Sequence, residues 1–262
     1  MKQKIYQIDA FTDHIFGGNP AAVCILENWL PEGLMQNIAA ENNLAETAFA
    51  VKNKESYELR WFTPELEVDL CGHATLATAF VLFNYYGHIE DTIRFYSPRS
   101  GELLVEKGND GTMTMDFPAD ELQTLPPDTT IDKAIGKAPL ETFKGKTDYV
   151  LIYGSQQEIA QIRPNFHLLN SLDCRGVIIS SPGENVDFVS RFFAPQSGIP
   201  EDPVTGSAHT SLTPYWAKKL NKTKLTARQI SSRGGDLQCE FLGHRVKISG
   251  RAVCYLMGEI TI

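Results

Sequence analysis

The sequence lacks the features that mark several large classes of protein. Its 262 residues carry 24 Lys and Arg against 32 Asp and Glu, a formal net charge of −8, and no basic run is longer than the pair Lys218-Lys219. Proteins that bind nucleic acid need a concentrated basic surface to neutralise phosphates. No nucleic-acid partner is therefore expected. An acidic total still permits an anionic small-molecule substrate, because a helix N-terminus makes a site locally positive.

Long apolar runs and paired cysteines are also missing. The longest apolar stretch, Leu76–Phe83, is far too short to span a bilayer, and the first residues run directly into a strand-like pattern with no signal-peptide core. No membrane partner and a cytoplasmic location are expected. The five cysteines are odd in number and no two have CxxC spacing, so neither a disulfide framework nor a metal site is predicted.

Short β-type segments, rich in Val, Ile, Tyr, Phe and Thr and bounded by turn residues, dominate the chain. Apolar residues at helical spacing predict three helices: Pro31–Glu41, His73–Tyr86 and Ser207–Leu220. Pro214 is expected to kink or split the third helix. The Pro-rich, polar region 119–146 near the midpoint predicts a boundary between two halves, residues 1–120 and 121–262, with a crossover of the chain allowed near either terminus.

The two halves contain the same local pattern. Arg60–Pro64 (RWFTP) resembles Arg191–Pro195 (RFFAP), which lies 131 residues further on, half the chain length. In each half a turn follows, and then a glycine opens a largely apolar helix, at Gly72 and at Gly206. This repeated order predicts an α+β protein of two pseudo-symmetric halves, each a mostly antiparallel, barrel-like sheet wrapped around one central helix.

The two glycine-led helix starts are candidate binding sites. Gly72 and Gly206 let a ligand approach the main chain, and each helix start presents unsatisfied N–H groups and the positive end of the helix dipole. Either one alone is a simple tight helix start, with Ser207 an ordinary cap. If pseudo-symmetry brings both to one cleft, together they can hold a carboxylate.

Several polar side chains lie near these helix starts in the sequence. Glu46 precedes an apolar segment, which predicts a poorly solvated carboxylate with a raised pKa suited to acid–base work, although a solvated boundary glutamate explains it as well. His73 is expected to stay neutral at its helix N-terminus, or simply to cap or pack. Asp202 lies in a Pro-flanked loop, where its simplest role is to cap the helix that follows or to hold the turn. Asn19 and Ser100 lie on turns.

Several segments of this sequence, taken together, resemble the phenazine-biosynthesis PhzF-like proteins of the diaminopimelate-epimerase-like superfamily. The matching segments follow in order over nearly the whole chain: DAFTDHIFGGNPAAV, NNLAETAF, LRWFTPELEVDLCGHATLATA, SPRSGEL and FFAPQSGIPEDPVTGSAH. The resemblance implies two pseudo-symmetric barrel-like halves around central helices, an active site between the halves, and a homodimer.

The resemblance also implies a chemistry. In the characterised family enzyme, a dihydro-hydroxyanthranilate isomerase, a glutamate transfers a proton on a small cyclic amino acid without metal or coenzyme. The family motifs imply catalytic roles for a set of four residues: Glu46, His73, Asp202 and Ser207. They imply substrate contacts at a further four: Asn19, Gly72, Ser100 and Gly206. Arg233 and Gly234, in SSRGGDL, match the family less securely.

A neighbouring branch, the amino-acid epimerases and proline racemases, uses two thiols placed just before the corresponding glycines. Here Cys71 precedes Gly72 but Thr205 precedes Gly206, and a hydroxyl of pKa far above 7 does not replace a thiol as a base. Two-thiol racemisation is therefore disfavoured, and the favoured hypothesis is a cofactor-independent isomerase that uses one glutamate on a small carboxylate substrate. Two alternatives stay open: a hydrolase or transferase with Cys71 as nucleophile, and a non-catalytic small-molecule-binding homologue.

Overall fold

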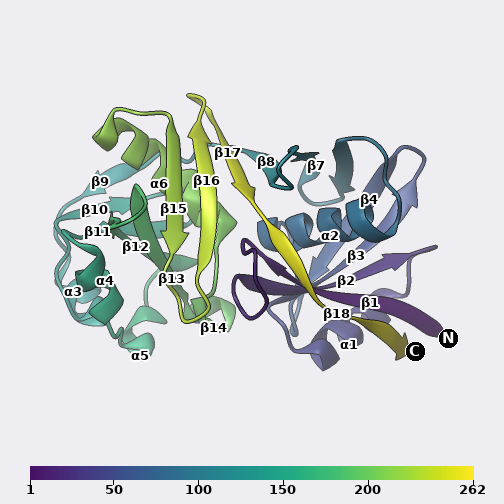
Figure 1. Ribbon diagram of the computed structural model, residues 1–262. Helices are drawn as coiled ribbons and strands as arrows, with labels where there is room; N and C mark the ends of the chain where they lie inside the picture. The colour runs from purple at the N-terminus through teal and green to yellow at the C-terminus, as the bar shows by residue number, and fades with distance from the viewer. The chain divides into compact units, whose positions relative to one another are not determined.

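The computed structural model describes residues 1–262, and the chain forms two compact units (Figure 1). Unit 1 comprises Met1–Asp116 and Ser249–Ile262, and unit 2 comprises Phe117–Ile248. The last residues of the chain thus belong to the first unit, a crossover of the kind that the predicted boundary allowed near either terminus. None of the helices combines the length and apolar character needed to cross a bilayer.

Unit 1 contains a sheet with two helices. Its strands are β1 (Lys2–Ala10), β2 (Asn19–Leu26), β3 (Glu46–Asn53), β4 (Ser56–Phe62), β5 (Glu67–Val68), β6 (Thr92–Ser97), β7 (Gly101–Lys107), β8 (Met113–Pro118) and β18 (Ala252–Thr261), and its helices are α1 (Glu32–Asn42) and α2 (Gly72–Tyr85). The strands pair in the order β18-β1-β2-β3-β4-β6-β7-β8. All pairs are antiparallel except β2–β3 and β4–β6.

Unit 2 contributes a second set of strands with its own helices. Its strands are β9 (Gln123–Leu125), β10 (Glu141–Lys144), β11 (Asp148–Ile152), β12 (Gly176–Pro182), β13 (Phe188–Ala194), β14 (Ile199–Asp202), β15 (Lys224–Gln229), β16 (Gly235–Phe241) and β17 (Arg245–Gly250). Its helices are α3 (Thr129–Ile135), α4 (Gln156–Gln161), α5 (Phe166–Leu169), the short 3-10 helix η1 (Pro195–Ser197) and α6 (Gly206–Leu220). The order β9-β10-β11-β12-β13-β15-β16 repeats the order of unit 1, with parallel pairs at the same two places, β11–β12 and β13–β15.

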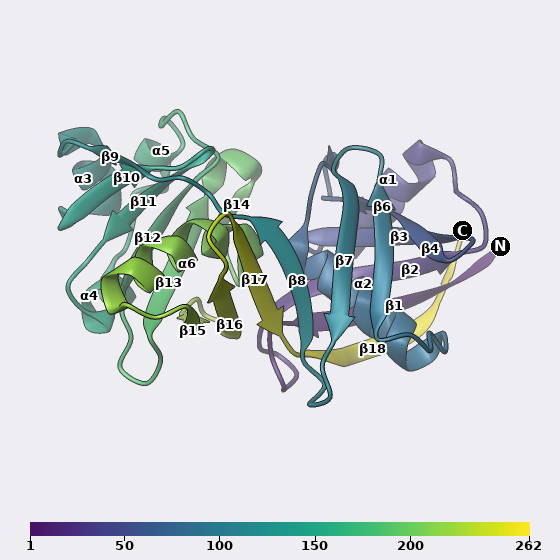
Figure 2. The ribbon, with the colours of Figure 1, turned by 90° about the horizontal axis from the view of Figure 1, so that it is seen from above.

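The predicted fold class, α+β with two mostly antiparallel sheets that each hold a central helix, is confirmed. In Figure 1, α2 runs between β7 on one side and β1 and β2 on the other, and Figure 2 shows β6 and β7 crossing over it. Nine of its 14 residues are buried, which explains why its sequence is apolar all round rather than on one stripe. The three helices predicted in sequence begin and end within one residue of α1, α2 and α6.

Pro214 does not split α6, contrary to the expectation from the sequence. Proline has no N–H for the carbonyl four residues before it, so the Thr210 carbonyl loses its helical partner. The main-chain N–H of Asp120 donates to that carbonyl at 3.2 Å. A partner from outside the helix therefore satisfies the orphaned acceptor, and the helix continues to Leu220.

The repeat detected in the sequence corresponds to the same ion pair in both units. In unit 1 the Arg60 guanidinium donates to both carboxylate oxygens of Glu67, at 2.6 and 2.7 Å. In unit 2 Arg191 donates in the same way to Glu201, at 2.7 and 2.9 Å. Each bidentate pair joins a long strand, β4 or β13, to the short strand or turn before the central helix. The two arginines thus anchor the two loops that lead to the glycine-led helix starts.

Candidate active site

Five predicted residues of unit 1 meet at the N-terminus of α2. Asn19 opens β2, Glu46 opens β3, and Cys71, Gly72 and His73 form the start of α2. The β2–β3 pair sets Glu46 beside Ala21, two residues after Asn19, so both polar side chains come from the same end of the sheet. The Glu46 side chain is 14% exposed and that of His73 is 7% exposed. The carboxylate is therefore poorly solvated, as its apolar sequence neighbours indicated.

The imidazole of His73 connects these side chains. Its Nε2 lies 3.2 Å from Oε2 of Glu46, and its Nδ1 lies 3.2 Å from the Asn19 side-chain nitrogen and 3.4 Å from Sγ of Cys71. An amide NH2 group only donates, so Nδ1 is the acceptor and Nε2 carries the ring proton. His73 thus has its protonated Nε2 3.2 Å from the Glu46 carboxylate.

His73 is neutral at physiological pH. Burial lowers the pKa of His73 to about 3, because the low-dielectric surroundings disfavour the charged imidazolium. The sequence anticipated a neutral ring but attributed it to the helix dipole, whereas desolvation accounts for the shift. A neutral imidazole of such low pKa beside the Glu46 carboxylate does not compete with it for a proton.

The same three side chains are also potential metal ligands. One donor atom each from Glu46, Cys71 and His73 lies within 4.8 Å of the others. A single ion binds only one nitrogen of an imidazole, yet His73 turns Nδ1 towards Cys71 and Nε2 towards Glu46. A metal ion held by all three would therefore bind His73 through one ring nitrogen, with the other nitrogen left to a neighbouring side chain.

In unit 2 a second set of predicted residues lies at the N-terminus of α6. Asp202 ends β14, Thr205 is the N-cap residue, and Gly206 and Ser207 open the helix. The Thr205 hydroxyl donates to the Asp202 carboxylate, and its main-chain N–H donates to the side-chain oxygen of Gln229 at 2.9 Å. Thr205, which replaces the second thiol of the racemases, therefore holds the loop together.

Sequence reasoning missed three residues of this second set. Arg175 donates to the Ser207 hydroxyl at 3.0 Å and also pairs with Asp148. Gln229 donates to the Asp202 carbonyl at 2.7 Å and so anchors the loop before α6. The three missed residues, Arg175, Asp148 and Gln229, lie on strands or strand ends far from α6 in the sequence, and no local motif marks them. The sole signal was the repeat itself, which would have pointed to β12 as the counterpart of β3.

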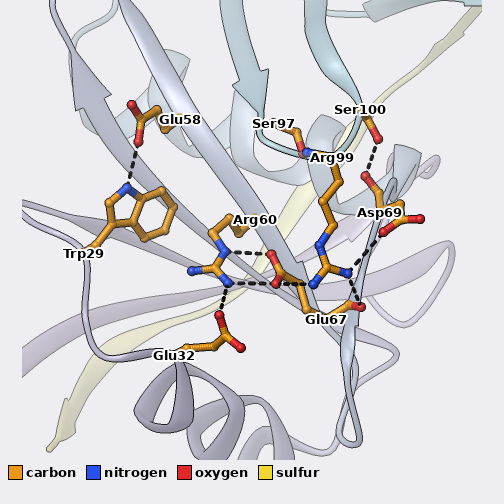
Figure 3. Close-up of polar contacts among 9 residues, drawn as sticks. All are labelled: Trp29, Glu32, Glu58, Arg60, Glu67, Asp69, Ser97, Arg99 and Ser100. Carbon is orange, nitrogen blue, oxygen red and sulfur yellow. Dashed lines mark hydrogen bonds and ion pairs between the residues drawn. The ribbon is translucent and has the colours of Figure 1, made fainter.

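Ser100 lies elsewhere in unit 1. It occupies the turn between β6 and β7, and its hydroxyl donates to the main-chain oxygen of Asp69, as Figure 3 shows. The neighbouring Arg99 bonds to Glu67 at 2.9 Å and to the Asp69 carboxylate at 3.1 Å. Ser100 is thus hydrogen-bonded to the loop that leads to Cys71, and its hydroxyl proton is donated to the main-chain oxygen of Asp69.

The less secure motif, Arg233-Gly234, lies in the turn between β15 and β16. The Gly234 N–H donates to the Ser231 hydroxyl at 3.1 Å, and that hydroxyl donates to the carbonyl of Pro203 at 2.8 Å. Gly234 has φ +68°, a conformation that favours glycine. This turn therefore supports the segment that carries Asp202.

The duplicated α+β fold, with Glu46 at the start of β3 beside His73 at the start of a central helix, is that of the diaminopimelate-epimerase-like proteins. Among solved structures, a hydroxyproline epimerase from Agrobacterium vitis with bound trans-4-hydroxy-L-proline shares this fold at a TM-score of 0.65 and 9% identity, over 99% of this chain and 91% of that one.

More specifically, the chain belongs to the PhzC-PhzF family of phenazine biosynthesis-like proteins, whose family model matches residues 8–258. It is 48% identical over 260 residues to an uncharacterized isomerase of Pseudomonas aeruginosa, covering 99% of each chain. A PhzF family protein of Enterococcus faecalis superposes with a TM-score of 0.97 at 50% identity, covering 100% of both chains. The predicted family and the predicted enzyme class, an isomerase, are confirmed.

Proposed function

We propose that this protein is a cofactor-independent isomerase that moves a proton within a small, carboxylate-bearing, amino acid-like substrate. Glu46 takes the proton from a carbon of the substrate and returns it to another. The observation that carries this proposal is the 3.2 Å approach of the Glu46 carboxylate to Nε2 of a buried, neutral His73. It supports a carboxylate that is held in one orientation and shielded from water.

The neighbouring groups have distinct roles in this proposal. His73 keeps its Nε2–H 3.2 Å from the charged carboxylate of Glu46 and favours that charge, while the second oxygen faces the substrate. Asp202 and Ser207 bind the polar groups of the substrate, and the N–H groups at Gly72 and Gly206 stabilise its negative charge. One placed acid–base group contributes on the order of 10²–10⁴ in rate, so charge stabilisation and orientation supply the remainder. The homodimer implied by the family resemblance is part of the same proposal, and light scattering measures it.

Replacing Glu46 tests the proton step. Glu46→Gln keeps the shape and a hydrogen-bonding group but removes the base, so we expect the rate to fall by at least about 100-fold. The measurement is NMR-detected deuterium incorporation from D2O into small cyclic amino acids, with the substrate chosen as the compound that the unaltered protein exchanges. Glu41→Gln, which changes an exposed glutamate of α1, is the matched control. Full exchange by Glu46→Gln would refute the assignment.

A specific observation supports a second candidate function. Cys71, His73 and Glu46 follow one another in the order thiol, imidazole and carboxylate, with separations of 3.4 and 3.2 Å. This is the order of a cysteine hydrolase, in which the acid orients the base. The lowered pKa of His73, about 3 because of burial, makes the ring a weak base and disfavours this candidate. Loss of activity in Cys71→Ser, together with a covalent intermediate trapped on Cys71 of the unaltered protein, would establish it instead.

A further inference from the structure

The two halves place different chemistry at the same structural position. Thr47 pairs with Phe62 across β3 and β4, and Val177 pairs with Phe193 across β12 and β13. Phe62 and Phe193 correspond to each other in the sequence repeat. The residue that corresponds to Glu46 is therefore Gly176, the first residue of β12.

The side chain at this position of unit 2 comes from the residue before the glycine. Arg175 directly precedes Gly176, and its guanidinium donates to Ser207 at 3.0 Å. Ser207 is the second residue of α6, as His73 is the second residue of α2. In each half a charged side chain thus reaches from the start of corresponding strands, β3 and β12, to the second residue of the central helix. In unit 1 the charge is a carboxylate, and in unit 2 it is a guanidinium.

The guanidinium of Arg175 is held rigidly. It donates Nε to Oδ1 of Asp148 at 2.9 Å, and Nη2 to the other oxygen of that carboxylate, whose side chain is 4% exposed. It also lies over the ring of Phe192, with Cζ 5.3 Å from the centroid. A Cβ at Gly176 would lie 2.4 Å from Cζ of Phe192, so the glycine is required for this packing. The Arg175 side chain is still 39% exposed.

The contact with Arg175 determines what the Ser207 hydroxyl can do. Because the guanidinium only donates, Oγ of Ser207 accepts from it. No acceptor in unit 2 receives the hydroxyl proton of Ser207. The hydroxyl is thus turned so that its proton points away from Arg175, and the hydrogen bond that it accepts makes it a stronger donor.

We propose that Arg175 is a positioning residue that orients the Ser207 hydroxyl as a donor to a carboxylate oxygen of the substrate. Unit 2 then carries a pair that binds an anion, Arg175 and Ser207, at the position where unit 1 carries Glu46 and His73. This inference rests on the proposed function, since it assumes that Ser207 contacts the substrate. The three carboxylates of Asp120, Asp148 and Asp202 that surround Arg175 leave its charge largely compensated, which suits orientation through Ser207 better than direct binding of an anion.

A double-mutant cycle with matched probes tests this role. The probes are 2-aminobenzoate, a small cyclic amino carboxylate, and 2-aminobenzamide, which has the same shape without the charge; both are followed by fluorescence. We expect Arg175→Gln and Ser207→Ala each to raise the Kd for 2-aminobenzoate about tenfold, the equivalent of one hydrogen bond to a charged group. The double variant is expected to show about the same tenfold loss, because the two residues act as one unit. Binding of 2-aminobenzamide should change by less than about twofold in all variants.

Controls separate this role from a structural one. Arg163→Gln removes an exposed guanidinium that bonds only to main-chain carbonyls, and it should leave both Kd values unchanged. Where Arg175→Gln fails to fold, Arg175→Lys takes its place: lysine keeps the positive charge beside Asp148 but lacks the fork that reaches Ser207 as well, so the tenfold loss is still expected.

Three results would overturn the inference: additive losses that reach about a hundredfold in the double variant, equal losses for the amide and the carboxylate, or no binding of 2-aminobenzoate by the unaltered protein at millimolar concentration. Deuterium exchange by Glu46→Gln is measured separately. If the losses of 2-aminobenzoate affinity are additive and Glu46→Gln does not exchange deuterium, only the role of Arg175 is refuted. If Glu46→Gln exchanges deuterium at the full rate, the proposed function is refuted.

Discussion

At the scale of single residues, the two histidines in the first turns of α2 and α6 are buried in neutral form. Burial lowers the pKa of His73 to about 3 and that of His209 to about 4. Nδ1 of His209 lies 2.9 Å from the Thr205 carbonyl, so it donates its proton there. Neither ring gains a carboxylate partner strong enough to offset its burial. Each central helix therefore carries a histidine that stays neutral in the folded protein but takes up a proton in weak acid when the chain unfolds.

These histidines predict a loss of stability in weak acid. Each folded-state pKa lies below the unfolded value of about 6.5, so the unfolded chain binds more protons as the pH falls from about 6.5 towards 4. The free energy of unfolding should then decrease by about 1 kcal/mol per pH unit for each histidine, and this loss is absent above pH 7. Urea unfolding at pH 7.5 and pH 5 measures it.

Replacing His209 should flatten that dependence. His209→Gln removes one titrating group, so its unfolding free energy should depend less on pH, whatever its value at pH 7.5. His167→Gln, at an exposed histidine of α5, is the control and should leave the slope unchanged. An unchanged slope in His209→Gln would mean that burial of this ring does not control the acid response.

At the scale of elements, a bidentate Arg–Glu pair links a long strand to the segment before the central helix in each half. Arg191 is 8% exposed, and besides Glu201 it donates to the carbonyls of Ile159 and Ile162 at 2.8 and 2.9 Å. Those carbonyls lie at the end of α4, where helical partners run out. One guanidinium therefore joins β13, the segment before α6, and the end of α4.

Removing this guanidinium should destabilise the protein strongly. Arg191→Met keeps the aliphatic stem but leaves the half-buried Glu201 carboxylate without its bidentate donor and removes one of the two donors from each carbonyl. We expect a loss of about 3 kcal/mol in the free energy of unfolding. Arg94→Met, which breaks an exposed pair with Glu102 whose side chains are 62% and 60% exposed, should cost no more than about 1 kcal/mol. Chemical denaturation of both variants measures the difference, and equal costs would contradict the argument.

At the scale of the whole molecule, the two ends of the chain complete a single sheet. β18 pairs antiparallel with β1 from Lys2 opposite Thr261 to Ala10 opposite Ala252. The main-chain amine of Met1 also donates to the carbonyl of Ile262. Unit 1 is thus built from both ends of the chain, and unit 2 is one continuous insertion between them. Without β18, β1 would expose one long unpaired edge.

This topology predicts how unit 1 behaves when it is isolated. A permuted chain that joins residues 249–262 through a short linker to residues 1–116 should unfold cooperatively and give a dispersed NMR spectrum. Residues 1–116 alone lack β18 and should aggregate or remain partly unfolded, because nothing covers the edge of β1. Circular dichroism, NMR and light scattering distinguish the two chains, and a well-folded, monomeric 1–116 would refute the role of β18.

Local patterns by themselves determined much of this protein. Helical periodicity placed α1, α2 and α6, and the repeated FxP turn and glycine revealed the duplication and hence the α+β fold class. Glu46 and His73 were identified by family motifs, and their positions at the start of a strand and of a helix follow from the sequence. These properties depend on residues close together in the chain, which hydrophobic period and backbone preference control directly.

Tertiary structure decided which of these residues meet. Only the register of β3 and β12 shows that Arg175 corresponds to the neighbour of Glu46, and only folding brings Asp148 and Ser207 to its guanidinium. The pairing of β18 with β1 and the Asp120 contact that preserves α6 across Pro214 likewise join segments far apart in sequence. Such contacts form where the whole sheet buries its apolar face and satisfies its hydrogen bonds, so they are a property of the assembled core rather than of any local segment.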